Sequence, residues 1–253
     1  MNMEELKGKT ILVTGGSRGI GAAVAKGFAK SGAKIAITYR SDKRSASECA
    51  NEIRKLGSEC LIVKSRVEKA NEVRRTVRTV VKKFGRIDVL VNNAGIWKTG
   101  EIGKMTEEQW DETIDINLKG TFLYCNEVVP LMKKQKSGKI INISSTAGQR
   151  GELFHSHYAA SKGGVIAFTK SIAVELAQYN INVNSVSPGW VITDMTERIL
   201  ADPSFRSEIN KGIPRGDVAI PEDVVGSVLF LASNLSNHIV GATINVNGGS
   251  VLF

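Results

Sequence analysis

The 253-residue chain contains only three cysteines, Cys49, Cys60 and Cys125, and no two of them form a Cys-x-x-Cys pair. This usage excludes a disulfide framework and a zinc site built on cysteines, so we expect reduced thiols and no bound metal. The sequence also lacks a run of about 18 uncharged apolar residues, the length that a membrane-spanning helix needs. The first ten residues contain two glutamates and no apolar stretch typical of a signal peptide, which favours a cytoplasmic protein.

Aromatic residues make up only 6% of the chain and prolines number five, whereas 42% of the residues are hydrophobic and 23% are charged. These fractions exclude collagen-like, disordered and low-complexity proteins. A domain of this length buries about three quarters of its unfolded surface, so its core needs no metal or disulfide. No linker and no repeat of fixed period interrupts the chain, which predicts a single domain over residues 1–253.

Acidic residues are in the minority: 25 aspartates and glutamates stand against 34 lysines and arginines, and the net charge is +9. Residues 64–86 contain nine basic and two acidic side chains, which is +7 of that excess. Such a stripe can attract nucleic acid. However, Val73, Val77, Val80 and Phe84 recur at helical spacing there, so the basic residues are expected on the solvated face of an amphipathic helix. Nucleic-acid binding is therefore the less favoured interpretation.

Short β-branched segments alternate with amphipathic segments along most of the chain. The expected strands are Thr10–Thr14, Lys34–Thr38, Cys60–Val63, Asp88–Val91, Lys139–Ser144, Asn182–Ser187 and Thr243–Val246. The expected helices are Ile20–Lys30, Arg44–Leu56, Asn71–Phe84, Glu107–Pro130, Tyr158–Tyr179 and Pro221–Ala232. Several strands are almost continuously apolar, as in a sheet covered by helices on both faces. The pattern predicts an α/β fold, a doubly wound Rossmann-type domain with a seven-stranded parallel sheet.

Residues 189–215 are the longest departure from this alternation. They follow a predicted strand and contain short helical patterns near 193–200 and 204–211. Because the segment begins at the strand edge where open sheets bind ligands, we expect it to act as a lid over the site.

The first strand leads into the turn Thr14-Gly-Gly-Ser-Arg-Gly-Ile-Gly21, which opens a helix. Glycines let a backbone approach a ligand closely, and the N–H groups of a helix N-terminus suit a pyrophosphate. The spacing differs from Gly-x-Gly-x-x-Gly and from a P-loop, and a merely tight turn is the alternative. Its place after the first strand favours a dinucleotide site.

The tip of the second strand indicates which dinucleotide would bind. An acid there usually holds the ribose 2′-hydroxyl of NAD, whereas an arginine accommodates the 2′-phosphate of NADP. Here Arg40 occupies the tip, and Arg18 lies inside the glycine turn. Two guanidinium groups favour NADP(H), although each could be an ordinary surface arginine. Asp42 is better placed to cap the next helix than to bind ribose.

Tyr158 and Lys162 stand one helical turn apart at the start of a predicted helix, so both side chains share one face. A free tyrosine titrates near 10 and is a poor acid at neutral pH. A neighbouring ammonium favours the phenolate and eases release of the proton. Ser145 follows a predicted strand at the ligand-binding edge, where its hydroxyl could polarise a carbonyl together with Tyr158.

Taken together, these motifs resemble those of the short-chain dehydrogenase/reductase family. The matching motifs are TGGSRGIG (14–21), NNAG (92–95), Asn117, Ser145, YxxxK (158–162) and PGWVIT (188–193). They occur in the family's order and extend over nearly the whole chain. Residues 213–249 are most similar to the 3-oxoacyl-acyl-carrier-protein reductase branch and to the glucose dehydrogenases near it.

The resemblance implies a role for each matching residue. Tyr158 would be the general acid, Ser145 would hold the carbonyl oxygen, and Lys162 would bind the nicotinamide ribose and assist Tyr158. Asn117 would position a water that links Lys162 to a proton relay. Besides Tyr158 and Lys162, the implied cofactor-binding residues are Gly15, Ser17, Arg18, Gly19, Ile20, Gly21, Arg40, Arg66, Val67, Asn93, Ala94, Gly95, Pro188, Gly189, Val191 and Thr193. A homotetramer built through the last two helices and the final strand is implied as well.

Arg66 departs from the family pattern. The family usually has aspartate or asparagine before the valine that corresponds to Val67, and that side chain accepts a hydrogen bond from the adenine amine. Arginine has only donors, so Arg66 is expected to stack on the adenine face instead. The backbone contact of Val67 is expected to remain.

Aromatic and histidine side chains near these motifs are candidates for the substrate pocket. Trp97 and Trp190 follow two of the turns and are expected to wall it, and His155 and His157 are expected at its mouth. The residues as a whole predict NADPH-dependent reduction of a ketone, foremost a small or carrier-bound 3-oxoacyl thioester. A sugar or polyol dehydrogenase of the glucose type is the alternative enzyme. A cofactor-bound regulator or nucleic-acid-binding protein is the non-enzymatic alternative, which the Ser145, Tyr158, Lys162 and Asn117 set disfavours.

Overall fold

The computed structural model describes residues 4–252, so Met1–Met3 of the N-terminal stretch considered above and Phe253 lie outside the described residues. Within that range seven parallel strands form one sheet in the order β3-β2-β1-β4-β5-β6-β7. The strands are β1 (Thr10–Val13), β2 (Lys34–Tyr39), β3 (Cys60–Lys64), β4 (Val89–Asn92), β5 (Gly138–Ile143), β6 (Ile181–Pro188) and β7 (Thr243–Val246). The order reverses between β1 and β4, which opens a crevice at their carboxyl ends. The predicted fold class is confirmed.

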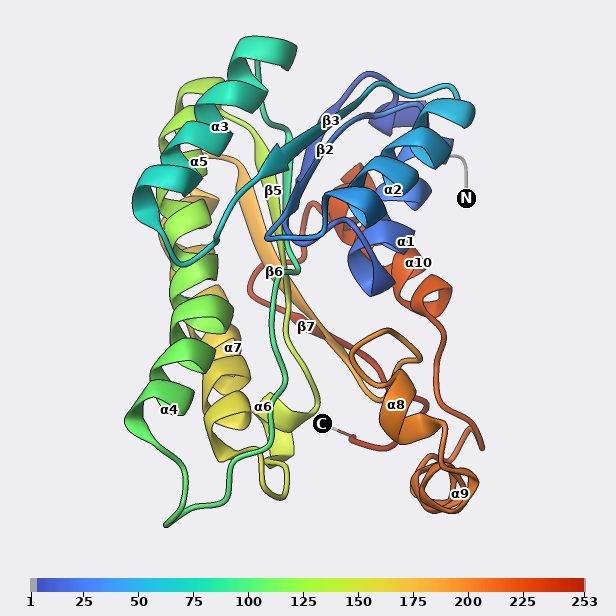
Figure 1. Cartoon of the computed structure of the whole chain (residues 1–253). Helices are drawn as coiled ribbons and strands as arrows, with labels where there is room; N and C mark the ends of the chain where they lie inside the picture. The colour runs from blue at the N-terminus through green and yellow to red at the C-terminus, as the bar shows by residue number, and fades with distance from the viewer. Residues whose placement is uncertain (1–3, 253) are drawn as a thin grey trace.

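Helices cover both faces of the sheet (Figure 1). One face carries α1 (Gly19–Lys30), α2 (Lys43–Lys55) and α10 (Pro221–Ala232), and the other carries α3 (Ala70–Phe84), α5 (Gly120–Gln135) and α7 (Ser156–Ala177). In β1, Ile11 and Val13 belong to the core under α1, whereas Leu12 belongs to the core under α3 and α5. Alternate side chains of a strand point to opposite faces, so a continuously apolar strand fits between two helical layers.

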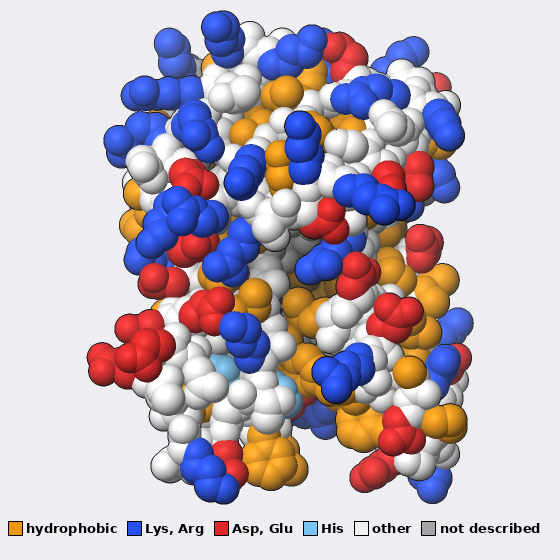
Figure 2. All heavy atoms as spheres, viewed as in Figure 1, with side chains coloured by type: hydrophobic (Ala, Val, Ile, Leu, Met, Phe, Trp, Pro, Cys, Tyr) orange, Lys and Arg blue, Asp and Glu red, His pale blue; other side chains and the backbone are white. Residues whose placement is uncertain are grey.

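The basic segment is the amphipathic helix α3, as predicted. Val73, Val77 and Val80 are buried against the sheet, and Arg74 and Arg75 are exposed on the outer side. Figure 2 shows lysine and arginine side chains crowded over this helix, at the upper left of the view. Helix α3 itself has five basic side chains and one acidic one, so part of the excess positive charge of the sequence lies on its outer face.

The helix expected over Glu107–Pro130 is a single helical run made of three parts. A π-helical turn, η2 (Asp115–Lys119), joins α4 (Glu107–Ile114) to α5 without a break. The run continues past Pro130 to Gln135 because the buried Met132 anchors its last turn against Gly138. A π turn is rare and often marks a functional site.

Residues 189–215 contain α8 (Glu197–Leu200) and α9 (Pro203–Lys211), close to the two expected short helices. A small apolar cluster built on Leu200, Ile213 and Val218 fixes this segment, with Trp190 packed against it. The short helix α6 (Ala147–Arg150), before α7, has no counterpart among the expected helices. No helix within residues 4–252 combines the length and apolarity needed to cross a bilayer.

Candidate active site

A cleft of about 540 Å³ runs along the carboxyl ends of the strands. The loops that follow β1 to β6 line it, so residues far apart in sequence meet there. Figure 2 shows the hollow in the middle of this face of the molecule. The volume lies within the range of about 300–1,000 Å³ that is usual for ligand sites. The site is thus where an open parallel sheet is expected to bind its ligand.

The glycine turn forms one wall of the cleft and has the conformation that the sequence predicts. Gly15 and Gly19 have φ values of 61° and 53°, a backbone conformation that residues with a side chain rarely adopt. A Cβ atom on Gly15 would lie only 3.0 Å from the Cα of Ala94. Helix α1 begins at Gly19, and the side chain of Arg18 makes no capping hydrogen bond. The N–H groups of the first turn are therefore available to a pyrophosphate, and this cradle fits a dinucleotide.

Asn93 fastens the loop after β4 to the glycine turn. Its Nδ2 donates to the carbonyl oxygens of Thr14 and Gly15, both at 3.0 Å. Gly21 lies behind this junction and does not line the cleft; a Cβ there would overlap the Asn93 amide and the Gly15 carbonyl. Gly21 therefore allows α1 to approach the turn closely, and its contact with the cofactor stays a prediction.

Arg18 and Arg40 both line the cleft beyond the glycine turn. Arg18 lies 3.4 Å from a carboxylate oxygen of Asp194, and Arg40 lies 3.7 Å from one of Glu112. Both arginine side chains are more than half exposed, at 61% and 52%, so these long ion pairs hold them weakly. Asp42 caps α2 as predicted: its carboxylate accepts a hydrogen bond from the Ser45 N–H at 3.0 Å.

Arg66 does not occupy the position expected for stacking on adenine. Its Nε donates to Glu72 at 2.8 Å, its backbone N–H donates to the other Glu72 oxygen at 2.8 Å, and its side chain is not part of the cleft wall. This pairing lowers the pKa of Glu72. Val67 and Glu68 do line the cleft. Glu72, in the first turn of α3, thus holds the guanidinium away from the cleft wall, and stacking on adenine would require this pair to open, so the adenine contact of Arg66 stays a prediction.

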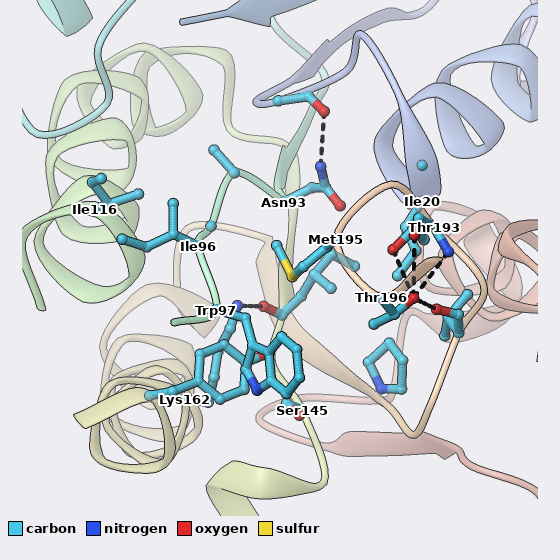
Figure 3. A pocket seen from close by; sticks show the side chains of 18 of the residues that line it. Ile20, Asn93, Ile96, Trp97, Ile116, Ser145, Lys162, Thr193, Met195 and Thr196 are labelled. Atoms are coloured by element: carbon cyan, nitrogen blue, oxygen red, sulfur yellow. Dashed lines mark hydrogen bonds between the residues drawn. The ribbon is translucent and has the colours of Figure 1, made fainter. Parts of the chain in front are cut away.

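Ser145, Tyr158 and Lys162 meet at the far end of the cleft from Arg40, as predicted. Helix α7 begins at Ser156, so Tyr158 and Lys162 lie in its first turns, and the Lys162 Nζ is 5.8 Å from the centre of the Tyr158 ring. The same Nζ donates to the Ile143 carbonyl at 2.8 Å. Figure 3 shows Ser145 and Lys162 beside Trp97, with Asn93, Ile20 and Thr193 toward the glycine turn.

The pKa values of this group differ from the expectation of an acidified tyrosine. Burial raises the pKa of Tyr158 to about 12, the hydrogen bond from Ser145 opposes this rise, and the Glu152 carboxylate adds to it. Burial lowers the pKa of Lys162 to about 8. The Lys162 ammonium donates to the Ile143 carbonyl and lies 5.8 Å from the centre of the Tyr158 ring, so its hydrogen bond goes to the backbone and not to the phenol oxygen. Tyr158 is therefore a protonated donor at neutral pH.

Lys162 should make the free energy of unfolding depend on pH. Its pKa is about 8 in the folded chain against 10.5 for a free lysine, so between these values only the unfolded chain keeps the proton. The unfolded state then binds more protons, and stability rises with pH. Relative to Lys162→Met, we expect the wild type to gain on the order of 3 kcal/mol from pH 8 to pH 10.5, measured by denaturant titration.

The control for this measurement is Lys170→Met, which removes an exposed lysine from the same helix. Its stability difference from the wild type should not change over that pH range. A difference between the wild type and Lys162→Met that stays flat would contradict the lowered pKa.

Asn117 lies in the π turn and is almost completely buried. Its Oδ1 accepts a hydrogen bond from the Ile96 N–H at 2.8 Å, and its Nδ2 donates to the Ile96 carbonyl and to Ser161 Oγ, both at 3.0 Å. The side chain therefore fixes the loop that carries Gly95 and Ile96 along the cleft. The water-positioning role implied by the resemblance stays a prediction.

An aromatic group walls the cleft next to Ser145. The rings of Trp97 and Trp190 meet edge to face, 5.6 Å apart, and Trp97 donates through Nε1 to Glu152 at 3.2 Å. Both tryptophans line the cleft, as predicted. His155 stacks flat on Trp97 at 4.4 Å and is buried, and His157 is fully buried, so neither histidine reaches the mouth of the pocket.

The cleft therefore gathers nearly all the residues that the sequence singled out. Of the implied cofactor-binding residues, all except Gly21 and Arg66 line it, and Asn117 supports it from behind. Sequence reasoning missed Glu68, Ile96, Ile116, Glu152 and Met195, which line it too. Glu152 could have been noticed in the sequence, because it is the one acidic residue in the segment 146–157 between Ser145 and Tyr158.

A doubly wound sheet, a pyrophosphate cradle and a Ser-Tyr-Lys group at the far end of one cleft define an oxidoreductase that uses a nicotinamide cofactor. Comparison with known proteins agrees. A family model described as enoyl-(acyl carrier protein) reductase matches residues 15–250. The chain is 44% identical over 252 residues to a 3-oxoacyl-[acyl-carrier-protein] reductase of Synechocystis sp., covering 99% of this chain and 100% of that protein.

Two solved structures have the same fold over nearly the whole chain. A short-chain type dehydrogenase/reductase from Mycobacterium marinum has a TM-score of 0.94 at 33% identity and covers 100% of this chain and 99% of its own. Levodione reductase has a TM-score of 0.93 at 30% identity and covers 98% of this chain and 99% of its own. The chain belongs to the short-chain dehydrogenase/reductase family.

Proposed function

We propose that the protein uses NADPH to reduce the ketone of a 3-oxoacyl thioester to a secondary alcohol. The observation that carries the proposal is the convergence of Ser145, Tyr158 and Lys162 at one end of a cleft whose other end holds the glycine turn and Arg40. The choice of a 3-oxoacyl substrate is supported by the relatives named 3-oxoacyl-[acyl-carrier-protein] reductase.

The chemistry follows from the positions of these side chains. When bound, the nicotinamide supplies a hydride to the carbonyl carbon, and the two π electrons of the C=O bond move to the oxygen. The Ser145 hydroxyl donates a hydrogen bond to that oxygen, where negative charge develops. Tyr158 gives its phenolic proton to the same oxygen as the general acid. A protonated Lys162 can replace its bond to Ile143 by one to the cofactor ribose and return a proton toward Tyr158.

A substrate panel tests this proposal. NADPH consumption would be followed with acetoacetyl thioesters, cyclic diketones, quinones and aldoses at equal concentrations. The largest kcat/KM for acetoacetyl thioesters, carried on coenzyme A or on acyl carrier protein, is the expected result. A preference for coenzyme A or for the carrier protein decides whether the substrate is small or carrier-bound. No turnover of any 3-oxoacyl thioester would refute the proposal.

The wall beside Ser145 favours a second candidate, a dehydrogenase of sugars or polyols. Trp97 and Trp190 present aromatic surface to the cleft, and the Glu152 carboxylate next to Trp97 can accept hydrogen bonds from hydroxyl groups. If this candidate is correct, Glu152→Gln should lower kcat/KM for aldoses or polyols selectively. The same change should leave small ketones nearly unaffected, because Ser145 and Tyr158 remain.

Variants of the basic face of α3 can distinguish the proposed enzyme from the non-enzymatic alternative. Arg74 pairs with Glu127 at 3.1 Å, Arg75 donates to the Lys64 carbonyl at 3.1 Å, and neither lines the cleft. Changing Arg74, Arg75 and Arg78 to glutamine should keep kcat for a small ketone within about twofold, because exposed ion pairs contribute little. A gel shift with DNA at physiological salt that disappears in this variant would instead support a nucleic-acid-binding protein.

The remaining proposals concern assembly and compartment. We propose a single domain that forms a homotetramer in the cytoplasm and has no nucleic-acid partner. Light scattering of the purified protein tests the assembly: the mass of the 27.3 kDa chain alone would contradict it.

A further inference from the structure

The Glu152 carboxylate in the wall of the cleft has one oxygen that binds no other group of the protein. Its Oε2 accepts a hydrogen bond from Trp97 Nε1 at 3.2 Å. Its Oε1 has no hydrogen-bond partner within the described chain and keeps exposed surface, and Glu152 lines the cleft. A ligand in the cleft can therefore reach this oxygen.

The cations on this side of the cleft leave the charge of Glu152 unpaired. Lys162 donates to the Ile143 carbonyl at 2.8 Å, and the Nδ1 of His155 lies 2.7 Å from the Leu153 carbonyl oxygen. Arg150 is exposed and lines the cleft. Within residues 4–252 Glu152 takes part in no ion pair. Its negative charge thus has no contacting cation in its own chain.

A substrate that fills the cleft displaces water from this carboxylate, and an ionised carboxylate is costly to bury without a partner. Burial already raises the pKa of Glu152, and the charges of His155 and Arg150 act against that rise. A hydroxyl group of the substrate would occupy the free oxygen and leave the charge uncompensated. A protonated amine would do both, because it donates hydrogen bonds and carries the opposite charge.

The surroundings of Glu152 also suit a cationic nitrogen. Trp97 and Trp190 present aromatic surface to the same part of the cleft, and aromatic surface is typical of sites that bind alkylammonium groups. Trp97, which binds Glu152 directly, lies beside Ser145 and Lys162 (Figure 3). A nitrogen at Glu152 would therefore be only a few bonds from the reacting carbonyl.

We propose that Glu152, together with Trp97 and Trp190, forms a subsite for a positively charged nitrogen, so that the protein also reduces amino ketones whose cation lies close to the carbonyl. The inference rests on the proposed NADPH-dependent reduction of ketones but not on the 3-oxoacyl thioester. The reaction is the same. The nicotinamide gives a hydride to the carbonyl carbon, Tyr158 gives a proton to the oxygen, and the nitrogen is unchanged.

Two ketones of equal shape test the subsite: acetonyltrimethylammonium and methyl neopentyl ketone, which differ by a charged nitrogen in place of a carbon. kcat/KM with NADPH would be measured for both in the wild type and in Glu152→Gln, whose amide oxygen can still accept from Trp97. Unit charges about 5 Å apart near a protein surface interact strongly enough to change kcat/KM by roughly 10- to 100-fold. The ratio of kcat/KM for the cation to that for the neutral ketone should therefore fall by about 10-fold or more in Glu152→Gln. The cation also activates the carbonyl chemically, but equally in both proteins, so the change in the ratio reports on Glu152.

Glu101→Gln is the control, because it removes an equal charge from an exposed glutamate that pairs with Lys104 outside the cleft. It should keep the wild-type ratio. The cation should also inhibit the reduction of an acetoacetyl thioester competitively, and more weakly in Glu152→Gln than in the wild type. If Glu152→Gln keeps the wild-type ratio, or if the cation does not inhibit the wild type, the subsite is overturned while the proposed function stands. A wild type that reduces neither ketone and no acetoacetyl thioester would refute the proposed function itself, and the subsite with it.

Discussion

Tyr158→Phe is expected to lower turnover by at least about 100-fold, the usual scale of general acid catalysis, while NADPH affinity changes little. The phenol is the proton donor nearest the proposed carbonyl site, and its raised pKa of about 12 keeps it protonated through the neutral range. Phenylalanine preserves the packing of the ring and removes the hydroxyl, and with it the transferable proton and the hydrogen bond with Ser145. Steady-state kinetics gives the turnover, and calorimetric titration with NADPH shows whether the cleft is intact.

Tyr179→Phe is the matched control because it removes a phenol from a partly exposed ring at the end of α7, outside the cleft. This control should keep wild-type turnover. Turnover of Tyr158→Phe close to that of the wild type would remove Tyr158 from the mechanism. Ser145 would then be the hydroxyl to test next.

The second large effect expected is on the choice of cofactor: kcat/KM should favour NADPH over NADH by about 10- to 1,000-fold at low salt. The 2′-phosphate carries nearly two negative charges and three acceptor oxygens. Arg18 and Arg40 line the cleft on that side, and their ion pairs with Asp194 and Glu112 are long enough to be exchanged for phosphate. Because both arginines are partly exposed, added salt should reduce the preference.

The double change Tyr39→Asp with Arg40→Leu should abolish or reverse this preference and leave kcat nearly unchanged. Tyr39 lines the cleft at the end of β2, where a carboxylate would repel the phosphate and could accept the ribose hydroxyls. Arg44→Leu, on the exposed side of α2 next to Glu48, is the control for the loss of one positive charge. Equal kcat/KM values for NADH and NADPH in the wild type would contradict the assignment.

The arrangement of strands and helices follows from the sequence because periodicity and apolar content report directly on burial. Strands such as β1 are apolar on both sides, and α3 shows its buried valines at helical spacing. Most of the site could also be predicted from the sequence, because its residues follow a strand or begin a helix at the same edge of the sheet. This holds for the glycine turn, Ser145, Tyr158 and Lys162.

What the sequence did not reveal depends on side-chain direction. Arg66 was expected on the adenine, but Glu72, six residues later, lies in the first turn of α3 within reach of its guanidinium. His157 was expected at the pocket mouth, but it packs on the inner side of α7 against Gly100. Periodicity describes which face of an element is buried, and it gives no information on which of two neighbouring polar groups a flexible side chain will choose.

The π turn at Asp115–Lys119 has a consequence for how this segment tolerates change in length. A π turn holds one residue more than an α turn, so deleting one residue there would convert the run into a regular α-helix. The residues after the deletion, including Tyr124, Val128 and Met132, would keep their places in the core, because the π turn is what absorbs the extra residue. Asn117 lies in that turn and would lose the position from which it holds Ile96 through two hydrogen bonds. A one-residue deletion there would thus spare the sheet and loosen the wall of the cleft, whereas the same deletion in the regular part of α5 would rotate the buried face by about 100°.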